Sequence, residues 1–187
     1  MNNVQYMLCC ETRSHKFLLE NSNLARRSDH TREEIHHMAL DAAEAIIIQQ
    51  GLSGLTARKV AAKIGYTVGT LYLVFKNLDD LIVQVNERTL SQLYQEMKQV
   101  TCKHEDSEAC ILALCRTYIE FAANNTPRWS MIYEHVLPND YVLPEAYQLQ
   151  VHQMFGLVEN ALRPLAQNKS NREIAQAARA LCCLLYT

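Results

Sequence analysis

Glycine and proline are scarce in this sequence, with only 5 Gly and 4 Pro among 187 residues. Both residues interrupt helices, and few segments alternate polar and apolar residues as a half-buried strand does. Hydrophobic residues make up 49% of the chain, which is enough to bury a core. The sequence therefore predicts an all-α protein with long helices.

Long apolar runs are also missing, since none approaches the roughly 18 residues that a membrane-spanning helix needs. The N-terminus has neither a basic start nor an unbroken apolar stretch, which argues against a secretory signal. The seven cysteines lack the spacing of a metal site or of a secreted disulfide framework. Reduced thiols in a cytoplasmic protein without membrane contact are expected, with a redox-sensing thiol as the alternative.

Motifs for catalysis are absent as well. The sequence contains no paired-histidine zinc motif, no phosphate-binding loop and no nucleophile elbow. His36 and His37 are adjacent, and adjacent helical side chains point in different directions, so a shared metal is not expected. We predict no catalytic residues, no metal and no cofactor. A small enzyme remains an alternative, which a bound cofactor or a cluster of perturbed titratable groups would favour.

A strong net charge is missing too, because the chain carries only −2 at neutral pH. The distribution is uneven, however. Residues 26–76 hold seven Lys and Arg against five Asp and Glu, whereas residues 77–187 hold nine against thirteen. A basic N-terminal part beside an acidic remainder mildly favours a phosphate-facing head on an acidic body.

The N-terminal third has signals for three helices in succession. Thr31 and Glu34 have the spacing of a capping box, and the apolar repeat that follows ends at Gly51. A second helix begins at Thr56 and ends at Gly65, and a third runs from Thr67 to Phe75. Two short helices joined by a glycine-containing turn and braced by a preceding helix match a helix-turn-helix.

The remaining residues predict a helical bundle. Asn77 and Asp80 have the spacing of a cap for a long helix, and Ser170 and Glu173 form a second capping-box pattern. The expected helices span residues 77–100, 107–124, 127–137, 145–165 and 170–186. The helix over residues 107–124 is apolar on nearly every face, so we expect it to be surrounded by the others.

The stretch from Leu55 to Leu81 resembles the head of the tetracycline-repressor (TetR) family. The Gly-Thr-Leu-Tyr core at residues 69–72, the phenylalanine three residues later and the acidic pair before Leu81 carry this resemblance. It extends over about residues 31–85. Beyond them only the helical pattern agrees.

The resemblance implies roles for individual residues in binding double-stranded DNA. Small residues at the start of the recognition helix would approach base edges, and hydroxyl and basic groups would contact phosphates. The implied DNA-binding residues are Thr56, Thr67, Val68, Gly69, Thr70, Tyr72 and Lys76. This chain departs from the family at Leu78, where a lysine is usual, and at Leu73 and Val74, which replace polar residues. These changes remove phosphate partners.

A second site is expected in the body, where aromatic rings and polar tips are combined as in ligand pockets. Its candidate residues are Cys115, Tyr118, Phe121, Trp129, Met131 and Tyr133. The alternative for each of them is a place in a packed core. Few charged residues occur in this region, so a small apolar effector is expected.

These observations predict three parts: a flexible leader at residues 1–28, a helix-turn-helix domain at 29–76, and a ligand-binding and dimerisation domain at 77–187. We expect a transcriptional repressor that binds a near-palindromic operator as a homodimer, through the helices at 145–165 and 170–186, and leaves it when the effector binds. A ligand-independent DNA-binding or protein-interaction module is the alternative, which a body without a cavity would favour.

Overall fold

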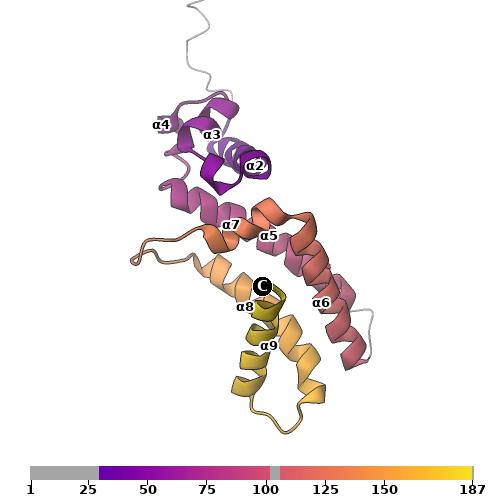
Figure 1. Ribbon diagram of the computed structural model, residues 1–187. Helices are drawn as coiled ribbons and strands as arrows, with labels where there is room; N and C mark the ends of the chain where they lie inside the picture. The colour runs from indigo at the N-terminus through magenta and orange to yellow at the C-terminus, as the bar shows by residue number, and fades with distance from the viewer. Residues whose placement is uncertain (1–29, 102–105, 187) are drawn as a thin grey trace, which may run out of the picture.

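The computed structural model describes residues 30–101 and 106–186, with side chains described as far as Cys182. The predicted leader lies outside these residues. Within them the protein is all-α, with eight α-helices, two short 3-10 helices and no strand. Figure 1 shows a small group of helices at one end of the molecule and a longer bundle below it. The predicted fold class is confirmed.

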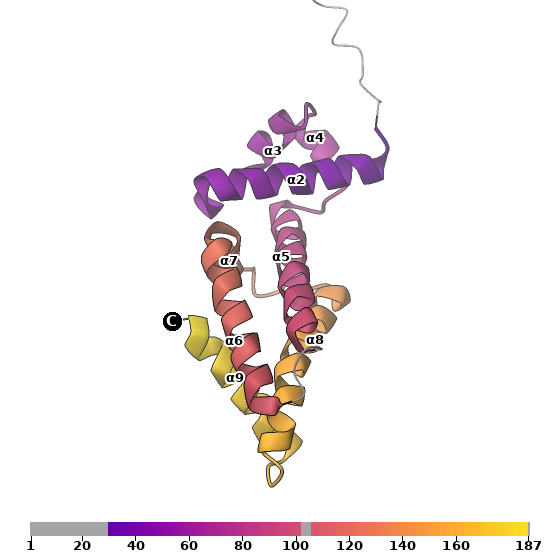
Figure 2. The same ribbon diagram turned by 90° about the vertical axis from the view of Figure 1, so that its right-hand side faces the viewer.

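The head consists of four elements: α2 (Arg32–Gln50), η2 (Leu52–Gly54), α3 (Ala57–Lys63) and α4 (Val68–Leu71). The body consists of six: α5 (Leu78–Thr101), α6 (Ser107–Asn124), α7 (Thr126–Glu134), α8 (Glu145–Leu162), η3 (Arg163–Leu165) and α9 (Asn171–Tyr186). In Figure 2, α2 lies across the upper ends of α5 and α7, and α5 runs down the bundle. At 1.5 Å per residue, α5 is about 36 Å long.

Side-chain caps fix where several helices begin. Thr31 and Glu34 form the predicted capping box, and the amide of Asp80 donates to Asn77 Oδ1 at 2.7 Å. Glu173 accepts hydrogen bonds from the Ser170 amide, the Lys169 ammonium and the Ser170 hydroxyl, and these bonds lower its pKa to about 2. Each cap satisfies an amide that the helix itself leaves without a partner.

Three predicted boundaries need correction. The third head helix does not continue as an α-helix to Phe75, because α4 ends at Leu71 and tighter turns follow it. The helix expected over residues 127–137 ends at Glu134. The helix after residue 145 loses its α-helical form at Arg163, where a 3-10 turn containing Pro164 begins.

The turn between α3 and α4 is formed by Gly65, whose φ is 77°. The amide of Tyr66 donates to the Ala61 carbonyl at 2.9 Å, and the amide of Gly65 donates to Ala62 at 3.2 Å. This pair of bonds is a Schellman motif, which requires a residue in the left-handed region. The motif lets the chain reverse from α3 into α4 within two residues.

Two apolar cores meet inside the molecule. The head core joins α2, α3 and α4 to the first turns of α5, and it includes Met131 of α7. The body core joins α5, α6, α8 and α9, and it includes Trp129 of the same α7. Helix α7 therefore contributes side chains to both cores.

Helix α6 is not surrounded, contrary to the expectation from its composition. Its buried residues form one stripe of Cys110, Leu114, Tyr118 and Phe121. On its outer side Leu112 is 63% exposed and Ile119 is 48% exposed. The amount of apolar surface on a helix does not determine how many neighbouring helices cover it.

Substituting Met131→Ala should destabilise the protein by about 2–5 kcal/mol, because this side chain is fully buried in the head core. Ile48→Ala is the matched control on the outer side of α2 and should change stability by less than about 0.5 kcal/mol. Urea denaturation of both variants measures the difference. Equal losses would show that α7 does not hold the head.

Candidate functional site

The recognition segment of the head is outward-facing. Leu71 is buried and anchors α4, whereas Thr67 and Gly69 are exposed and Tyr72 is 45% exposed. Val68 and Thr70 are half-buried. The short helix thus presents one polar, small-residue surface to its surroundings while its other side packs into the head core.

Thr67 begins α4 through two hydroxyl contacts. Its Oγ1 accepts from the Thr70 amide at 3.2 Å and lies 3.0 Å from the Thr70 hydroxyl. Thr56 caps α3 in the same way, by accepting from the Lys59 amide at 3.2 Å. Both threonines therefore have structural roles as caps, and their exposure leaves a second role open to them.

Gly69 has no steric reason within the protein to be glycine. Its φ is not positive, and an added Cβ would meet only Thr67 Oγ1, at an ordinary contact distance of 3.6 Å. Gly65 differs, because its backbone conformation is one that other residues rarely adopt. Contacts within the described part of the chain therefore do not explain the missing side chain at position 69.

Two basic residues of the head, Lys59 and Lys76, make different contacts. Lys59 is held internally, because its ammonium donates to Gln50 Oε1 at 2.6 Å and to the Gly54 carbonyl at 2.8 Å. Lys76 uses its backbone amide in the cap of α5, donating to Asp80 Oδ2 at 2.9 Å, while the residue is exposed. Lys59 thus uses its ammonium group within the head, whereas Lys76 uses its backbone amide.

A chain of contacts links the recognition segment to α2 and α5. The ring of His36 stacks on Phe75 with centroids 4.7 Å apart, and its Nε2 lies 2.7 Å from Gln84 Oε1. The side-chain amide of Gln84 donates through Nε2 to Asp80 Oδ1 at 3.3 Å. These contacts fix the end of the recognition segment against the long helix.

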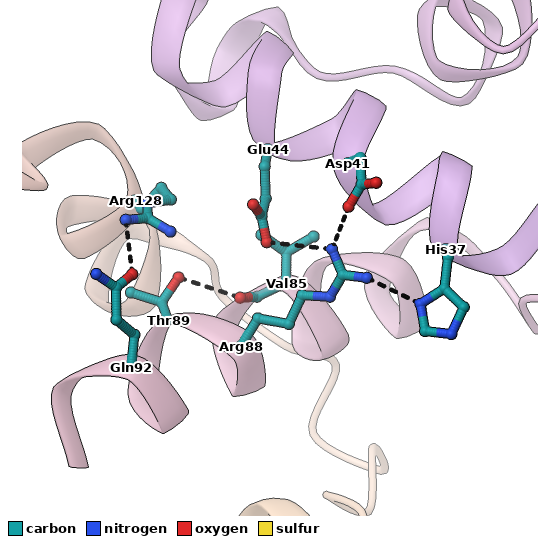
Figure 3. A network of polar contacts seen from close by, with 8 residues as sticks. All are labelled: His37, Asp41, Glu44, Val85, Arg88, Thr89, Gln92 and Arg128. Carbon is teal, nitrogen blue, oxygen red and sulfur yellow. Dashed lines mark hydrogen bonds and ion pairs between the residues drawn. The ribbon is translucent and has the colours of Figure 1, made fainter. Parts of the chain in front are cut away.

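Arg88 makes a second connection between the head and α5 (Figure 3). Its guanidinium contacts Asp41 at 2.6 Å and Glu44 at 3.6 Å, and it lies 3.2 Å from His37 Nδ1. All three partners are on α2. The polar contacts of Arg88 and the stacking of His36 together set the angle between head and body.

Of the candidate ligand residues of the body, Tyr118, Phe121 and Trp129 lie in the body core, whereas Tyr133 is 46% exposed. The Trp129 ring makes edge contacts with Tyr118 at 5.1 Å, Phe121 at 6.0 Å and Tyr133 at 5.6 Å. The hydroxyl of Tyr118 lies 3.3 Å from that of Tyr133 and donates to the Cys182 carbonyl. Met131 lies apart from this aromatic cluster, in the head core.

The space beside these residues is small. Cys115 and Tyr118 line an apolar void of about 10 Å³ between α5, α6, α8 and α9, which is at the lower limit for one water molecule. A larger crevice of about 530 Å³ lies elsewhere, between the connection from α4 to α5 and the loop before α8. Its lining residues are Lys76, Asn77, Asp80, Pro138, Asp140, Tyr141, Val142 and Pro144.

The thiols of α6 are not activated. Burial raises the pKa of both Cys110 and Cys115, so each thiol stays protonated at neutral pH. Within residues 30–101 and 106–186, no three His, Cys, Asp or Glu side chains are grouped so that they could hold a metal ion. None of the helices in these ranges is long and apolar enough to cross a membrane.

Two polar residues of the body were not among the predicted site residues. Asn86 is 4% exposed and its Oδ1 has no hydrogen-bond partner, and Tyr147 is half-buried at the start of α8. Asn86 has a signal in the sequence, because it occupies the apolar stripe of α5 in place of a hydrophobic residue. Tyr147 has none beyond its aromatic ring.

A short capped helix, a Schellman turn before it and two bracing helices make up a helix-turn-helix, and its outer surface is free for DNA. The architecture therefore defines a DNA-binding protein. Residues 39–85 match the family described as "Bacterial regulatory proteins, tetR family". The N-terminal domain of this chain is therefore a DNA-binding domain of the TetR family of transcriptional regulators. A comparison with curated protein sequences finds no match.

Solved structures share the whole fold at low sequence identity. A protein of unknown function from Rhodococcus sp. RHA1 has a TM-score of 0.68 at 16% identity, covering 86% of this chain and 82% of its own. The regulator FadR from Bacillus subtilis, in complex with stearoyl-CoA, has 0.59 at 14%, covering 80% and 97%. A putative TetR-family regulator from Vibrio parahaemolyticus has 0.56 at 20%, covering 81% and 83%. These likenesses establish the fold of head and body together.

Gly69→Ala should weaken DNA binding by about tenfold or more while raising stability by about 0.5–1 kcal/mol, because a methyl group blocks close approach and favours the helix. Gly65→Ala is the contrasting variant and should lower stability by about 1–2 kcal/mol, since its φ is positive. Fluorescence anisotropy with labelled DNA and thermal melting separate the two effects. Unchanged affinity in Gly69→Ala would remove position 69 from the interface.

Proposed function

We propose that this protein is a cytoplasmic repressor that binds a near-palindromic operator as a homodimer and is released from it by a small apolar effector. Residues 29–76 form the DNA-binding domain and residues 77–187 the regulatory and dimerisation domain. The observation that carries this proposal is that α7 packs in both cores: its Met131 lies in the head core and its Trp129 in the body core.

The proposed DNA contacts follow from the exposure of the recognition segment. Val68, Gly69 and Thr70 face base edges, because they are small and lie at the start of α4, where Gly69 is exposed and the other two are half-buried. Phosphates are bound by the exposed hydroxyl and amino groups around it, those of Thr56, Thr67, Tyr72 and Lys76. Leu73, 63% exposed beside Tyr72, supplies no phosphate contact, so the electrostatic part of affinity rests on few groups.

A homodimer is proposed because one short recognition helix reads only a few base pairs. The outer faces of α8 and α9 support this assignment. Leu149 of α8 is exposed, and a Cβ at Gly156 of the same helix would meet nothing within 4 Å. Ala177 and Ala180 of α9 are exposed as well. Small residues on two adjacent helices allow close packing against a second copy in a four-helix interface.

Ala177→Glu should convert the dimer into a monomer of 21.4 kDa at micromolar concentration, because it places a charge in the proposed interface. Operator affinity should fall by about 10³-fold or more, toward the nonspecific level. Ala123→Glu is the matched control, an exposed alanine on the outer side of α6. Analytical ultracentrifugation measures the mass. A wild-type monomer, or a dimer that survives Ala177→Glu, contradicts this interface.

The proposed release mechanism is a shift between two arrangements of the head. A ligand that binds among the aromatic rings of the body would displace Trp129, and the same helix would move Met131 in the head core. Operator affinity then falls by the ratio of the ligand's affinities for the two arrangements. The candidate ligand residues are Cys115, Tyr118, Phe121, Trp129 and Tyr133, with Met131 in the connecting role.

An apolar effector is supported by the lining of this region and by the fold's occurrence in the Bacillus subtilis regulator in complex with stearoyl-CoA. One observation favours the second candidate, a DNA-binding protein that needs no ligand. The void beside Tyr118 measures only about 10 Å³, so an effector requires the body to open. The exposed loop between α7 and α8 is the segment that would have to move.

An effector should change the fluorescence of Trp129, raise the melting temperature and release operator DNA in the same concentration range. Trp129 is the only tryptophan of the chain, so the signal reports on this site alone. A screen of apolar compounds with all three readouts tests the proposal. Release of DNA without a change at Trp129, or with full response in Trp129→Ala, would move the site elsewhere. No release by any compound would favour the ligand-independent protein.

A further inference from the structure

Asn86 is the conspicuous polar residue of the long helix. It is 4% exposed, and its Oδ1 is the one buried side-chain oxygen or nitrogen, within the ranges that the structure describes, that has no hydrogen-bond partner. Buried polar groups are nearly always satisfied in folded proteins, because an unsatisfied one has lost its water without compensation. An orphaned acceptor therefore needs an explanation.

The position of Asn86 on α5 places it toward the inside of the body. Leu90, Leu93 and Met97 belong to the body core, and Asn86 continues their spacing by one further step toward the head. Residues separated in this way lie on the same face of a helix. The amide thus occupies a place in the core stripe that a hydrophobic side chain would fill.

Two contacts between α5 and α7 show which part of α7 lies beside Asn86. Asp79 Oδ1 of α5 lies 2.8 Å from His135 Nε2, and Gln92 Oε1 accepts from Arg128 at 3.1 Å. The two helices are therefore antiparallel over this stretch, and Asn86, midway between Asp79 and Gln92, is level with the middle of α7. Trp129 and Tyr133 lie on either side of that level.

Helices α6 and α8 bring further polar groups to the same level. The Tyr118 hydroxyl of α6 lies 3.3 Å from that of Tyr133. Burial raises the pKa of Tyr147, a half-buried residue at the start of α8. Polar groups of α6 and α7 thus meet beside the Trp129 ring.

We propose that Asn86 Oδ1 is the hydrogen-bond acceptor for the effector, which is an apolar molecule carrying a hydroxyl or amide donor. This inference rests on the proposed effector function and names the chemistry of its ligand. The donor satisfies the orphaned oxygen, and the apolar remainder packs against the rings around Trp129. A ligand without a donor leaves the oxygen unsatisfied and binds more weakly.

The location explains how such a ligand would act on the head. Asn86 lies one residue from Val85, which belongs to the head core, and one turn from Leu90, which belongs to the body core. A group bound at Asn86 is therefore wedged between α5 and α7 where the two cores meet. Small displacements at this point change the packing of Met131 against the head.

The first test needs no ligand. Asn86→Leu keeps the number of side-chain heavy atoms and removes the unsatisfied oxygen, so the melting temperature should rise by about 2–4 °C. The matched control is Thr89→Val on the same helix. Thr89 is fully buried, but its hydroxyl donates to the Val85 carbonyl at 3.1 Å, so removing it should give no such gain.

The second test uses two pairs of probes that differ only in the donor: 1-octanol with 1-methoxyoctane, and 4-butylphenol with 4-butylanisole. The alcohol of at least one pair should raise the melting temperature of the wild type and of Thr89→Val, whereas its ether should have at most a tenth of that effect. Asn86→Leu and Asn86→Ala should respond equally to both members of a pair. Operator binding without probe should persist in the control variant Thr89→Val.

Three outcomes would overturn the assignment: equal shifts for alcohol and ether in the wild type, a preference for the alcohol that survives in both Asn86 variants, or no shift with any of the four probes. The first two leave the effector function standing, provided that the compounds still release DNA, and dismiss only Asn86. Release of operator DNA by apolar compounds is the separate measurement by which the effector function itself succeeds or fails.

Discussion

The apolar contact between α2 and the ends of α5 and α7 is the interaction on which the rest of the molecule depends. The three short head elements bury too little surface to hold the recognition helix in place by themselves. Their core is completed by the first turns of α5 and by Met131 of α7. DNA-binding geometry is therefore a property of the body as much as of the head, and this makes regulation from the body physically possible.

The polar contacts around this core orient the head relative to α5. Arg88 binds carboxylates of α2 (Figure 3). His36 stacks on Phe75 while it contacts Gln84 of α5. Such contacts add little stability where they are exposed to solvent, but they discriminate between orientations. The head is thus held at a defined angle to the body by few polar interactions.

Local features of this protein were predictable from the sequence because they depend on residues three or four positions apart. The caps at Thr31, Thr56 and Thr67 and the reversal at Gly65 are of this kind. The recognition motif was predictable for the same reason, since its residues are contiguous. The prediction that α6 is surrounded by other helices was wrong, because composition measures the apolar content of a helix and does not show which neighbours cover it.

The sequence by itself determined the helical class, the helix-turn-helix and the aromatic character of the body, all of which follow from short-range spacing. Only the tertiary structure decided that Met131 packs in the head core while Trp129, two residues away, packs in the body core. Only the tertiary structure shows that Asn86 Oδ1 is buried without a hydrogen-bond partner. These facts depend on which helices meet across the fold, and the chain separates those helices by dozens of residues, beyond the range of any local pattern.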